Sequence, residues 1–523
     1  VVQRLGIVGG LAVAGMVALL LVVLAATIVP SLVLPTPTLL PTPSPLPPTP
    51  TPGFVPGEHD VTVAVAPFAV NDASVDVEEA DLLVLRFSNL LDHELNAILN
   101  DPAMRSQRLT YGLIGPKVLD RVAGETLKDR QEIAQAIARQ HGVDVVVFGE
   151  IRRVGTGGPL SVQPEFYVSP ETYFEAQEIT GPQRFGTAIE VDDTQADFAT
   201  PSVQNARGEL SSRTTALAQV VIGLSRYALG DYDHALLAFQ QAQTVPNWEE
   251  THGREILNVL IGNSYLKVAQ EYGAQCDRER VLEQLDQARS QYETAQTLNP
   301  NASRAWAGLA SLSYLLAQWQ PVENAAVCES EDRKRFYIDL DQLEQAREYA
   351  REALLKVVQP LSTGVRIRVL FTQAQAVFGL YASEGRSAQQ YAEYLEELMT
   401  ITDQIIALID EPGVQPMALD SYFMRATAAV VEGDCPAALE EFSAFTRRVP
   451  ADISEDQTNE ERRRRMFFTE TAARCNTAVG QLEEARQLFG QAIQIAELLE
   501  SDFDVDRLER ELRTLNGDHT TEN

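Results

Sequence analysis

A short helical pattern that recurs in the second half of the chain limits its fold more than any other feature. In GDYDHALLAFQQAQTVPN (230–247) a turn glycine precedes alanines and an aromatic residue at helical spacing, and a proline follows. The same order returns at 433–450 and 480–492, and without the turn glycine at 285–301 and 343–354. The residues that carry the pattern are Gly230, Ala235, Phe239, Ala242, Ala288, Tyr292, Ala295, Pro300, Gly433, Ala438, Phe442, Pro450, Gly480, Ala485, Phe489 and Ala492.

Each copy follows another apolar helical stretch, such as ALAQVVIGLSRYAL with Gly223 or ASRAWAGLASLSYLL with Trp306. A two-helix unit of this kind buries its apolar face only by stacking on its neighbours. Alanine lets two helix backbones approach closely, and an aromatic residue one turn further along fills the remaining space. Glycine permits a tight turn between the helices, and proline ends the second helix. The pattern therefore predicts an all-α array of stacked helix pairs over residues 214–515.

These motifs resemble the tetratricopeptide repeat, a two-helix unit of about 34 residues. Five such units and a divergent one at 364–411 make six, and FDVDRLERELRTL (503–515) is similar to a capping helix. We expect residues 516–523 to form a disordered tail. The resemblance implies a superhelical solenoid whose inner groove binds protein partners, lined mainly by the first helix of each unit. The groove residues that it implies are Tyr227, Asn263, Arg304, Tyr314 and Arg474.

The N-terminal residues predict a membrane anchor followed by a spacer. Residues 5–29 are 25 consecutive residues without a charge, enough for a helix to cross a bilayer. A cleaved signal peptide, which usually has a shorter apolar core, is the alternative. Arg4 is the only charge before them, so the positive-inside rule places the N-terminus in the cytoplasm and the body outside. Residues 30–57 are rich in proline and threonine and predict an extended stalk of a bacterial single-pass membrane protein.

Residues 58–191 predict a small α/β domain with the order β-α-β-α-β-β. Strands are expected at 61–68, 111–115, 142–154 and 160–168, helices at 78–99 and 129–141, and one or two further strands over 173–191. The stretches VAPF and IARQHGVDVVVFGEIRR are similar to the N-terminal domain of TolB and its relatives. This resemblance implies a non-catalytic module for assembly or partner binding. The polar stretch 192–213 is expected to be a linker to the helical array.

The four cysteines predict two disulfides. We expect loops with roughly 14 or more extra residues around 270–284 and 319–341, and these contain Cys276 and Cys328 respectively. Adjacent repeats place equivalent loops side by side, so these two thiols should lie close together. Cys435 and Cys475 fall at the start of a second helix and in the first helix that follows it. In an extracytoplasmic body these positions predict the pairs Cys276–Cys328 and Cys435–Cys475, and four buried thiols are the alternative.

No constellation of residues in the sequence indicates catalysis, a cofactor or a metal. The six histidines are scattered, and HEL at 93–95 lacks the second histidine of a zinc-protease helix. With 74 acidic against 42 basic residues, the net charge of −32 disfavours binding to nucleic acid. The sequence therefore favours an extracytoplasmic scaffold that binds proteins. A homo-oligomer, a subunit of an envelope assembly or export complex, and a ligand sensor acting through the α/β domain stay open as alternatives.

Overall fold

A computed structural model describes most of the chain after residue 58. The described residues are 59–70, 77–101, 109–153, 158–171, 173, 176–191, 201–246, 248, 253–319, 338–356, 361–383, 385–411, 414–448 and 459–516. The expected anchor and stalk lie outside this set, as do Cys328 and Pro450. None of the helices within these ranges is long and apolar enough to cross a membrane. The chain divides into Val1–Pro50 and a compact unit, Thr51–Asn523, and the description below concerns the second.

The first part of this unit is a mixed β-sheet with the strand order β3-β1-β4-β5-β6. β1 is parallel to both β3 and β4, whereas β5 is antiparallel to β4, β6 and β7. The small mixed sheet is confirmed, but two short strands, β1 and β2, stand where one strand over 61–68 was expected. The segment after residue 173 contains a 3₁₀ turn, η2 (Gln177–Ile179), and two strands. The strands are β1 (Val61–Val65), β2 (Ala69–Val70), β3 (Tyr111–Ile114), β4 (Val145–Arg153), β5 (Leu160–Val168), β6 (Gly181–Arg184) and β7 (Ile189–Val191).

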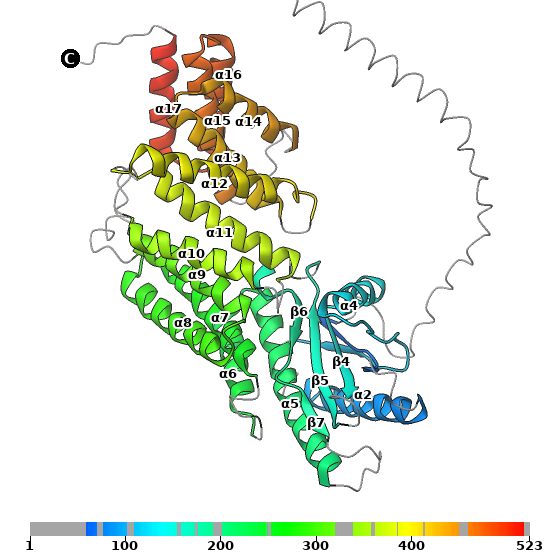
Figure 1. Cartoon of the computed structure of the whole chain (residues 1–523). Helices are drawn as coiled ribbons and strands as arrows, with labels where there is room; N and C mark the ends of the chain where they lie inside the picture. Colours follow the sequence, from blue (N-terminus) through cyan, green and yellow to red (C-terminus); the bar gives the residue numbers. More distant parts are fainter. Residues whose placement is uncertain are drawn as a thin grey trace, which may run out of the picture. The chain divides into compact units, whose positions relative to one another are not determined.

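Helices cover both faces of the sheet (Figure 1). Along β1, Val61, Val63 and Val65 face a core shared with α2 (Val77–Leu99) and α5 (Pro201–Ala228), while Ala64 faces α4 (Leu127–His141). This division follows from the two-residue repeat of a strand, which points successive side chains to opposite faces. α4 begins with a capping box between Thr126 and Asp129. Both faces of the sheet are therefore covered by helices, so its polar side chains must lie at the rim of the sheet or pair with one another.

α5 is longer than the sequence pattern indicates. The polar stretch 192–213 is expected to be a linker, yet the chain is helical from Pro201 onward. Ala206 and Leu210 are buried and join the core between the sheet and the helices. A helix needs only one narrow apolar stripe to pack against a sheet. The remaining residues of this stretch are polar, so its composition resembles that of a linker. α5 thus belongs to the sheet's core and to the helical array at once.

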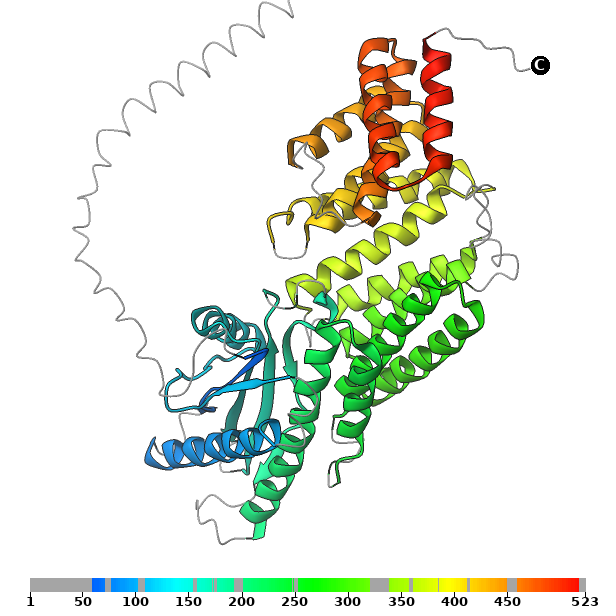
Figure 2. The same cartoon turned by 180° about the vertical axis from the view of Figure 1, so that it is seen from behind.

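Six helix pairs and a last helix follow one another along the described chain (Figures 1 and 2). This arrangement is compatible with a helical-repeat solenoid, and its six pairs and terminal helix match the number of units expected from the sequence. The pairs are α5 with α6 (Tyr232–Gln243), α7 (Glu255–Ala274) with α8 (Arg278–Leu298), α9 (Ser303–Trp319) with α10 (Leu340–Leu355), α11 (Thr363–Tyr381) with α12 (Ala388–Ile406), α13 (Gln415–Val431) with α14 (Cys435–Arg448), and α15 (Asn459–Ala478) with α16 (Leu482–Leu498); α17 (Asp502–Leu515) is last.

The recurring residues do what their spacing predicts. Gly230, Gly433 and Gly480 adopt φ of 74°, 78° and 82° in the turns between paired helices. A Cβ on Gly223 would lie 2.4 Å from the Phe239 ring, so the glycine is what lets α5 approach α6. The other alanines and aromatics of the pattern are buried, except that Phe442 and Trp306 are half-buried and Pro300 is exposed; the buried set is Ala235, Phe239, Ala242, Ala288, Tyr292, Ala295, Ala438, Ala485, Phe489 and Ala492.

The loop expected around residues 270–284 is absent. α7 continues to Ala274 and α8 starts at Arg278, so the additional residues lengthen both helices and leave a short turn. Cys276 adopts φ of 62° in that turn, the left-handed conformation that Gly230, Gly433 and Gly480 provide in the turns of their own pairs. In the second expected loop, 319–341, residues 320–337 lie outside the described part of the chain.

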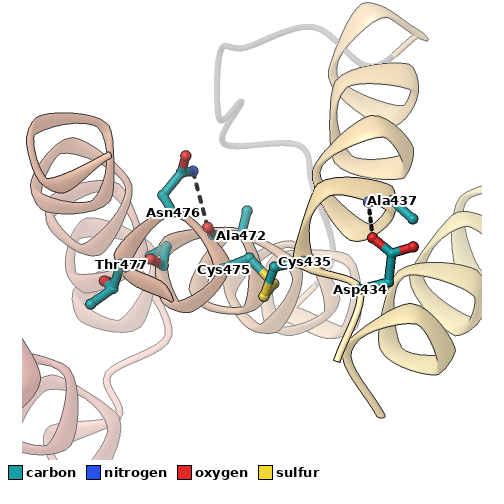
Figure 3. The surroundings of a disulfide bond; sticks show 8 residues. Asp434, Cys435, Ala437, Ala472, Cys475, Asn476 and Thr477 are labelled. Carbon is teal, nitrogen blue, oxygen red and sulfur yellow. Dashed lines mark hydrogen bonds between the residues drawn. A yellow bond between two sulfur atoms is a disulfide. The ribbon is translucent and has the colours of Figure 1, made fainter. Parts of the chain in front are cut away.

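A disulfide joins two neighbouring pairs of the array, as expected. Cys435, the first residue of α14, is bonded to Cys475 in α15, with a Cα–Cα distance of 5.0 Å (Figure 3). Cys475 is buried. Cys276 is also disulfide-bonded. Its expected partner, Cys328, lies outside the described residues, so that pairing stays a prediction.

Candidate functional site

A polar cluster between the sheet and the helical array surrounds residues 177–181, which we call the docking segment. It consists of the 3₁₀ turn η2 and the start of β6. Gln177, Ile179 and Thr180 are almost fully buried. The first helices of four consecutive pairs, α5, α7, α9 and α11, each contribute a side chain to this segment. The helical array thus binds a short segment of its own chain through side chains of four first helices.

The carboxylate of Glu178 is the centre of the cluster. It accepts a hydrogen bond of 2.6 Å from the hydroxyl of Tyr227 on α5. The Nζ of Lys267 on α7 lies 3.2 Å from one carboxylate oxygen, and the Nε of Arg368 on α11 lies 3.2 Å from the other. Three helices that are far apart in the sequence therefore meet at one carboxylate.

The backbone of the docking segment is held as well. Arg304 on α9 donates to the carbonyl oxygens of Glu178 and Thr180, at 2.8 and 2.5 Å. The hydroxyl of Ser362, the N-cap of α11, donates to the same Thr180 carbonyl at 3.2 Å. A Cβ on Gly181, which has φ of 89°, would lie 2.4 Å from the Cβ of Ser362. The fit is so close that only glycine is accommodated at this point.

The surroundings shift the pKa values of these groups in the directions that fix their charges. Burial disfavours ionisation of Glu178, but Arg368 and Lys267 outweigh it and lower its pKa to about 2. Burial, followed by the charge of Glu178, raises the pKa of Tyr227 well above 10. Burial alone lowers the pKa of Arg304 to about 10. Glu178 is therefore ionised and Arg304 is cationic at neutral pH.

The structure brings together two of the five predicted groove residues, Tyr227 and Arg304, at the docking segment. Asn263 is buried inside the array, where it accepts a hydrogen bond of 2.7 Å from the hydroxyl of Tyr292. Asn263 thus orients the aromatic residue of its own pair and does not reach the docking segment in any described contact.

The other two predicted groove residues lie further along the array. Tyr314 on α9 packs at the edge of the core formed by residues of α9 to α15, and burial raises its pKa to about 12. Arg474 on α15 is half-exposed and forms ion pairs with Glu470 at 2.7 Å and with Glu511 of α17 at 2.5 Å. Neither residue contacts the docking segment in the described structure.

Sequence reasoning missed Glu178, Lys267, Arg368 and Ser362. Glu178 lies in the stretch EAQEIT, which carries no strong periodicity, and nothing in it indicates a partner among the helices. Lys267 is the single basic residue of α7, and Arg368 is one of two arginines on α11. The scarcity of basic residues on these largely apolar first helices of an acidic chain is the one signal that could have found them.

A second buried charge cluster lies inside the α/β domain. Arg130 of α4, almost fully buried, makes two hydrogen bonds of 2.7 Å to Glu165 of β5, and Glu150 of β4 lies 3.3 Å away. The remaining Arg130 nitrogen donates to the carbonyl of Gly124. Because its partners saturate Arg130, the cluster fixes α4 on the sheet.

Within the described ranges no group of three or more histidine, cysteine, aspartate or glutamate residues is placed to hold a metal ion. No protein-family model matches the chain, and a search of curated proteins found no match.

Proposed function

We propose that this chain is a non-catalytic scaffold of the cell envelope. In this proposal residues 5–29 anchor it in a bacterial membrane, the 30–57 stalk holds the body away from the bilayer on the extracytoplasmic side, and the body consists of a TolB-like α/β module and a solenoid of six tetratricopeptide repeats. Its task is to recruit protein partners, and it needs no cofactor or nucleic acid for that.

The observation that carries the proposal is the way the array holds the docking segment. Side chains from four successive first helices converge on a short polypeptide, bind its carboxylate and donate to its backbone carbonyls. First helices of a repeat array line its inner surface. The first helices therefore carry the hydrogen-bond donors and charges needed to bind a polypeptide. In the first four pairs these groups bind the docking segment of the same chain. We propose that partners bind further along, around Arg474 on α15.

Disulfide bonding supports the extracytoplasmic side of the membrane. Cys435 and Cys475 are bonded to each other, and Cys276 is bonded as well. Stable disulfides form in oxidising compartments and are rare in the bacterial cytoplasm. This agrees with the topology expected from Arg4 and the apolar stretch 5–29.

Site-specific photo-crosslinking in the native cell tests the proposal. A benzophenone amino acid at Arg474, on a first helix, should capture defined proteins, and the matched replacement at Arg486, on the second helix α16, should not. Arg474 and Arg486 are both partly exposed and both form ion pairs, so the two variants differ mainly in the surface they report. Equal crosslinking from the two positions, or none from Arg474, would contradict the proposal.

A further inference from the structure

A polar cavity lies where α4, the end of β5, the docking segment and the first turn of α11 meet. Its accessible volume is about 60 Å³. A single water needs about 10–15 Å³ on this measure, so the cavity has room for about four to six waters. It can therefore hold a few water molecules or one edge of a larger molecule whose remainder stays in solvent.

Three polar residues of the cavity wall already have partners within the chain. The hydroxyl of Ser362 donates to the carbonyl of Thr180, and the hydroxyl of Thr180 donates to the carbonyl of Gln177. The amide nitrogen of Gln177 donates to the carbonyls of Pro170 and Tyr173, at 3.4 Å each. These groups hold the docking segment in place, so a ligand must bind to other groups of the wall.

Two side-chain amides of α4 line the cavity without a partner. Gln131 and Gln135 lie one turn apart on the same face of this helix, and both are half-buried. Neither amide forms a hydrogen bond with another described residue, and the same holds for the hydroxyl of Thr363 in the first turn of α11. An amide or a hydroxyl can both donate and accept, so this part of the wall matches a ligand that does both.

A buried tyrosine adds a third kind of group to the wall. Tyr167 of β5 lines the cavity and is only 1% exposed, and its hydroxyl forms no hydrogen bond within the described part of the chain. The charges of Glu171 and Arg139 act on this hydroxyl, and Arg139 is itself part of the wall, so the hydroxyl lies on the cavity side of the ring. Burial, followed by the charge of Glu171, raises the pKa of Tyr167, so the hydroxyl is protonated at neutral pH. Leaving a buried hydroxyl unpaired is costly, and a bound group would remove that cost.

The charges around the cavity favour a neutral ligand. The Nε of Arg139 lies 2.6 Å from Glu171, and the charge of Glu411, which lines the cavity, also acts on Arg139. Two carboxylates thus balance one arginine, so no surplus of positive charge favours an anion. The first N–H groups of α11, a helix of 19 residues, carry a partial positive charge, which disfavours a cation.

We propose that this cavity binds the hydroxyl-bearing edge of a neutral sugar. Each sugar hydroxyl donates and accepts at once, as the amides of Gln131 and Gln135 and the hydroxyl of Tyr167 require. A planar amide or carboxylate presents two polar atoms side by side, which matches two neighbouring hydroxyls of a sugar ring, and Glu411 supplies such a carboxylate. The site is separate from the surface proposed for protein partners around Arg474 and does not depend on that proposal.

Calorimetric titration of the full chain, in a detergent without sugar groups, tests the site with glucose, galactose and mannose. These three sugars present different arrangements of neighbouring hydroxyls, and tetrahydropyran, the same ring without hydroxyls, is the control. We expect at least one sugar to bind saturably and tetrahydropyran not to bind. No saturable binding of any of the three up to about 50 mM, or equal binding of tetrahydropyran, overturns the proposal.

A disaccharide that ends in the best-binding sugar identifies the source of the ligand. Binding at least as tight as that of the single sugar supports the site and assigns it to the end of a sugar chain. Weaker binding supports the site as one for a free sugar, because the second ring then clashes with the wall.

Variants separate a built site from adventitious binding. Tyr167→Phe removes the hydroxyl and keeps the ring, and it should weaken the best sugar about five- to tenfold. Tyr422→Phe is the matched control, at a buried tyrosine of α13 that also has no hydrogen bond in the described structure and does not line this cavity. Gln135→Leu should weaken the sugar by a similar factor, and melting temperatures show that each variant is folded. Equal binding to the wild type and to both lining variants means adventitious binding only and overturns the proposal.

Discussion

Glu178 shows how one residue can fasten two parts of a chain. Its carboxylate is held by Tyr227, Lys267 and Arg368, which belong to three different first helices. Removing one partner of a buried ion pair is costly, because the remaining charges stay desolvated and unpaired. Glu178 is therefore worth more to the fold than an ordinary surface carboxylate.

Replacing Glu178 by glutamine should lower the free energy of unfolding at pH 7 by about 3 kcal/mol, the value that a pKa near 2 implies against an ordinary 4.5. The sign of the pH dependence follows from the lowered pKa: the stabilisation is complete above about pH 5 and is lost as the pH falls towards 2. Urea unfolding of the wild type and Glu178→Gln between pH 7 and pH 3 measures both effects.

A matched control for this substitution is Glu483→Gln, at an exposed glutamate that pairs only with Arg486 in its own helix. It should leave stability unchanged, because exposed ion pairs contribute little. A pH-independent difference between the wild type and Glu178→Gln would show that Glu178 acts by its shape and not by its charge.

Two helical glycines, Gly308 on the first helix α9 and Gly490 on the second helix α16, provide a second test at this scale. A Cβ on Gly308 would lie 2.2 Å from the ring of Tyr292, whereas a Cβ on Gly490 would meet nothing within 4 Å. Gly308→Ala should destabilise the protein by about 1–3 kcal/mol through overpacking. Gly490→Ala, in the interior of α16, should stabilise it by about 0.5–1 kcal/mol through helix propensity. Denaturant unfolding of both variants measures the change in the free energy of unfolding. A change of the same sign in both would refute the packing role of Gly308.

Among the elements, α14 and α15 are joined by a covalent bond as well as by packing. The disulfide Cys435–Cys475 closes a loop with a sequence separation of 40 residues. In the chain-entropy model such a loop corresponds to about 4 kcal/mol. The double variant Cys435→Ser and Cys475→Ser should therefore unfold at a lower guanidinium concentration than the oxidised wild type, with the loss concentrated in α13 to α17 by hydrogen exchange.

Peptide mapping of the double variant without reduction gives the control. It should still contain a disulfide involving Cys276, and our expectation is that Cys328 is its partner. A peptide that joins Cys276 to anything else would refute that pairing, and equal stability of the double variant and the wild type would refute the role of the first disulfide.

The sequence predicted the elements well where a repeating pattern defines them. Alanine and aromatic spacing located the helix pairs, and turn glycines located the ends of their first helices, because these features are local. It failed where packing between distant segments decides. α5 begins at Pro201 because Ala206 and Leu210 pack against a face of the sheet. No local sequence pattern indicates that contact.

The candidate site was only half predictable for the same reason. Tyr227 and Arg304 follow from their places on first helices, and their contacts with the docking segment depend on how the α/β domain meets the array. Glu178 has no neighbours in sequence that indicate a partner. Long-range pairing of a single carboxylate with Lys267 and Arg368 leaves no trace in the periodicity of either helix.

For the whole molecule, the expected anchor is testable without further structure. Removal of residues 1–29 should release the protein from the membrane fraction into the soluble fraction, because 5–29 is the long uncharged apolar stretch. Carbonate extraction of membranes that contain the full chain or the truncated chain measures this. A truncated chain that stays with the membrane would place the attachment in the body.

The central claim is that the chain is a scaffold that recruits protein partners from its extracytoplasmic body. The most direct measurement is the mass and composition of what is purified with it from its native membrane in mild detergent. The account predicts a single copy of the chain with partners present in less than equal amounts. A large complex of fixed stoichiometry would contradict it and would make the protein a structural subunit of an envelope assembly.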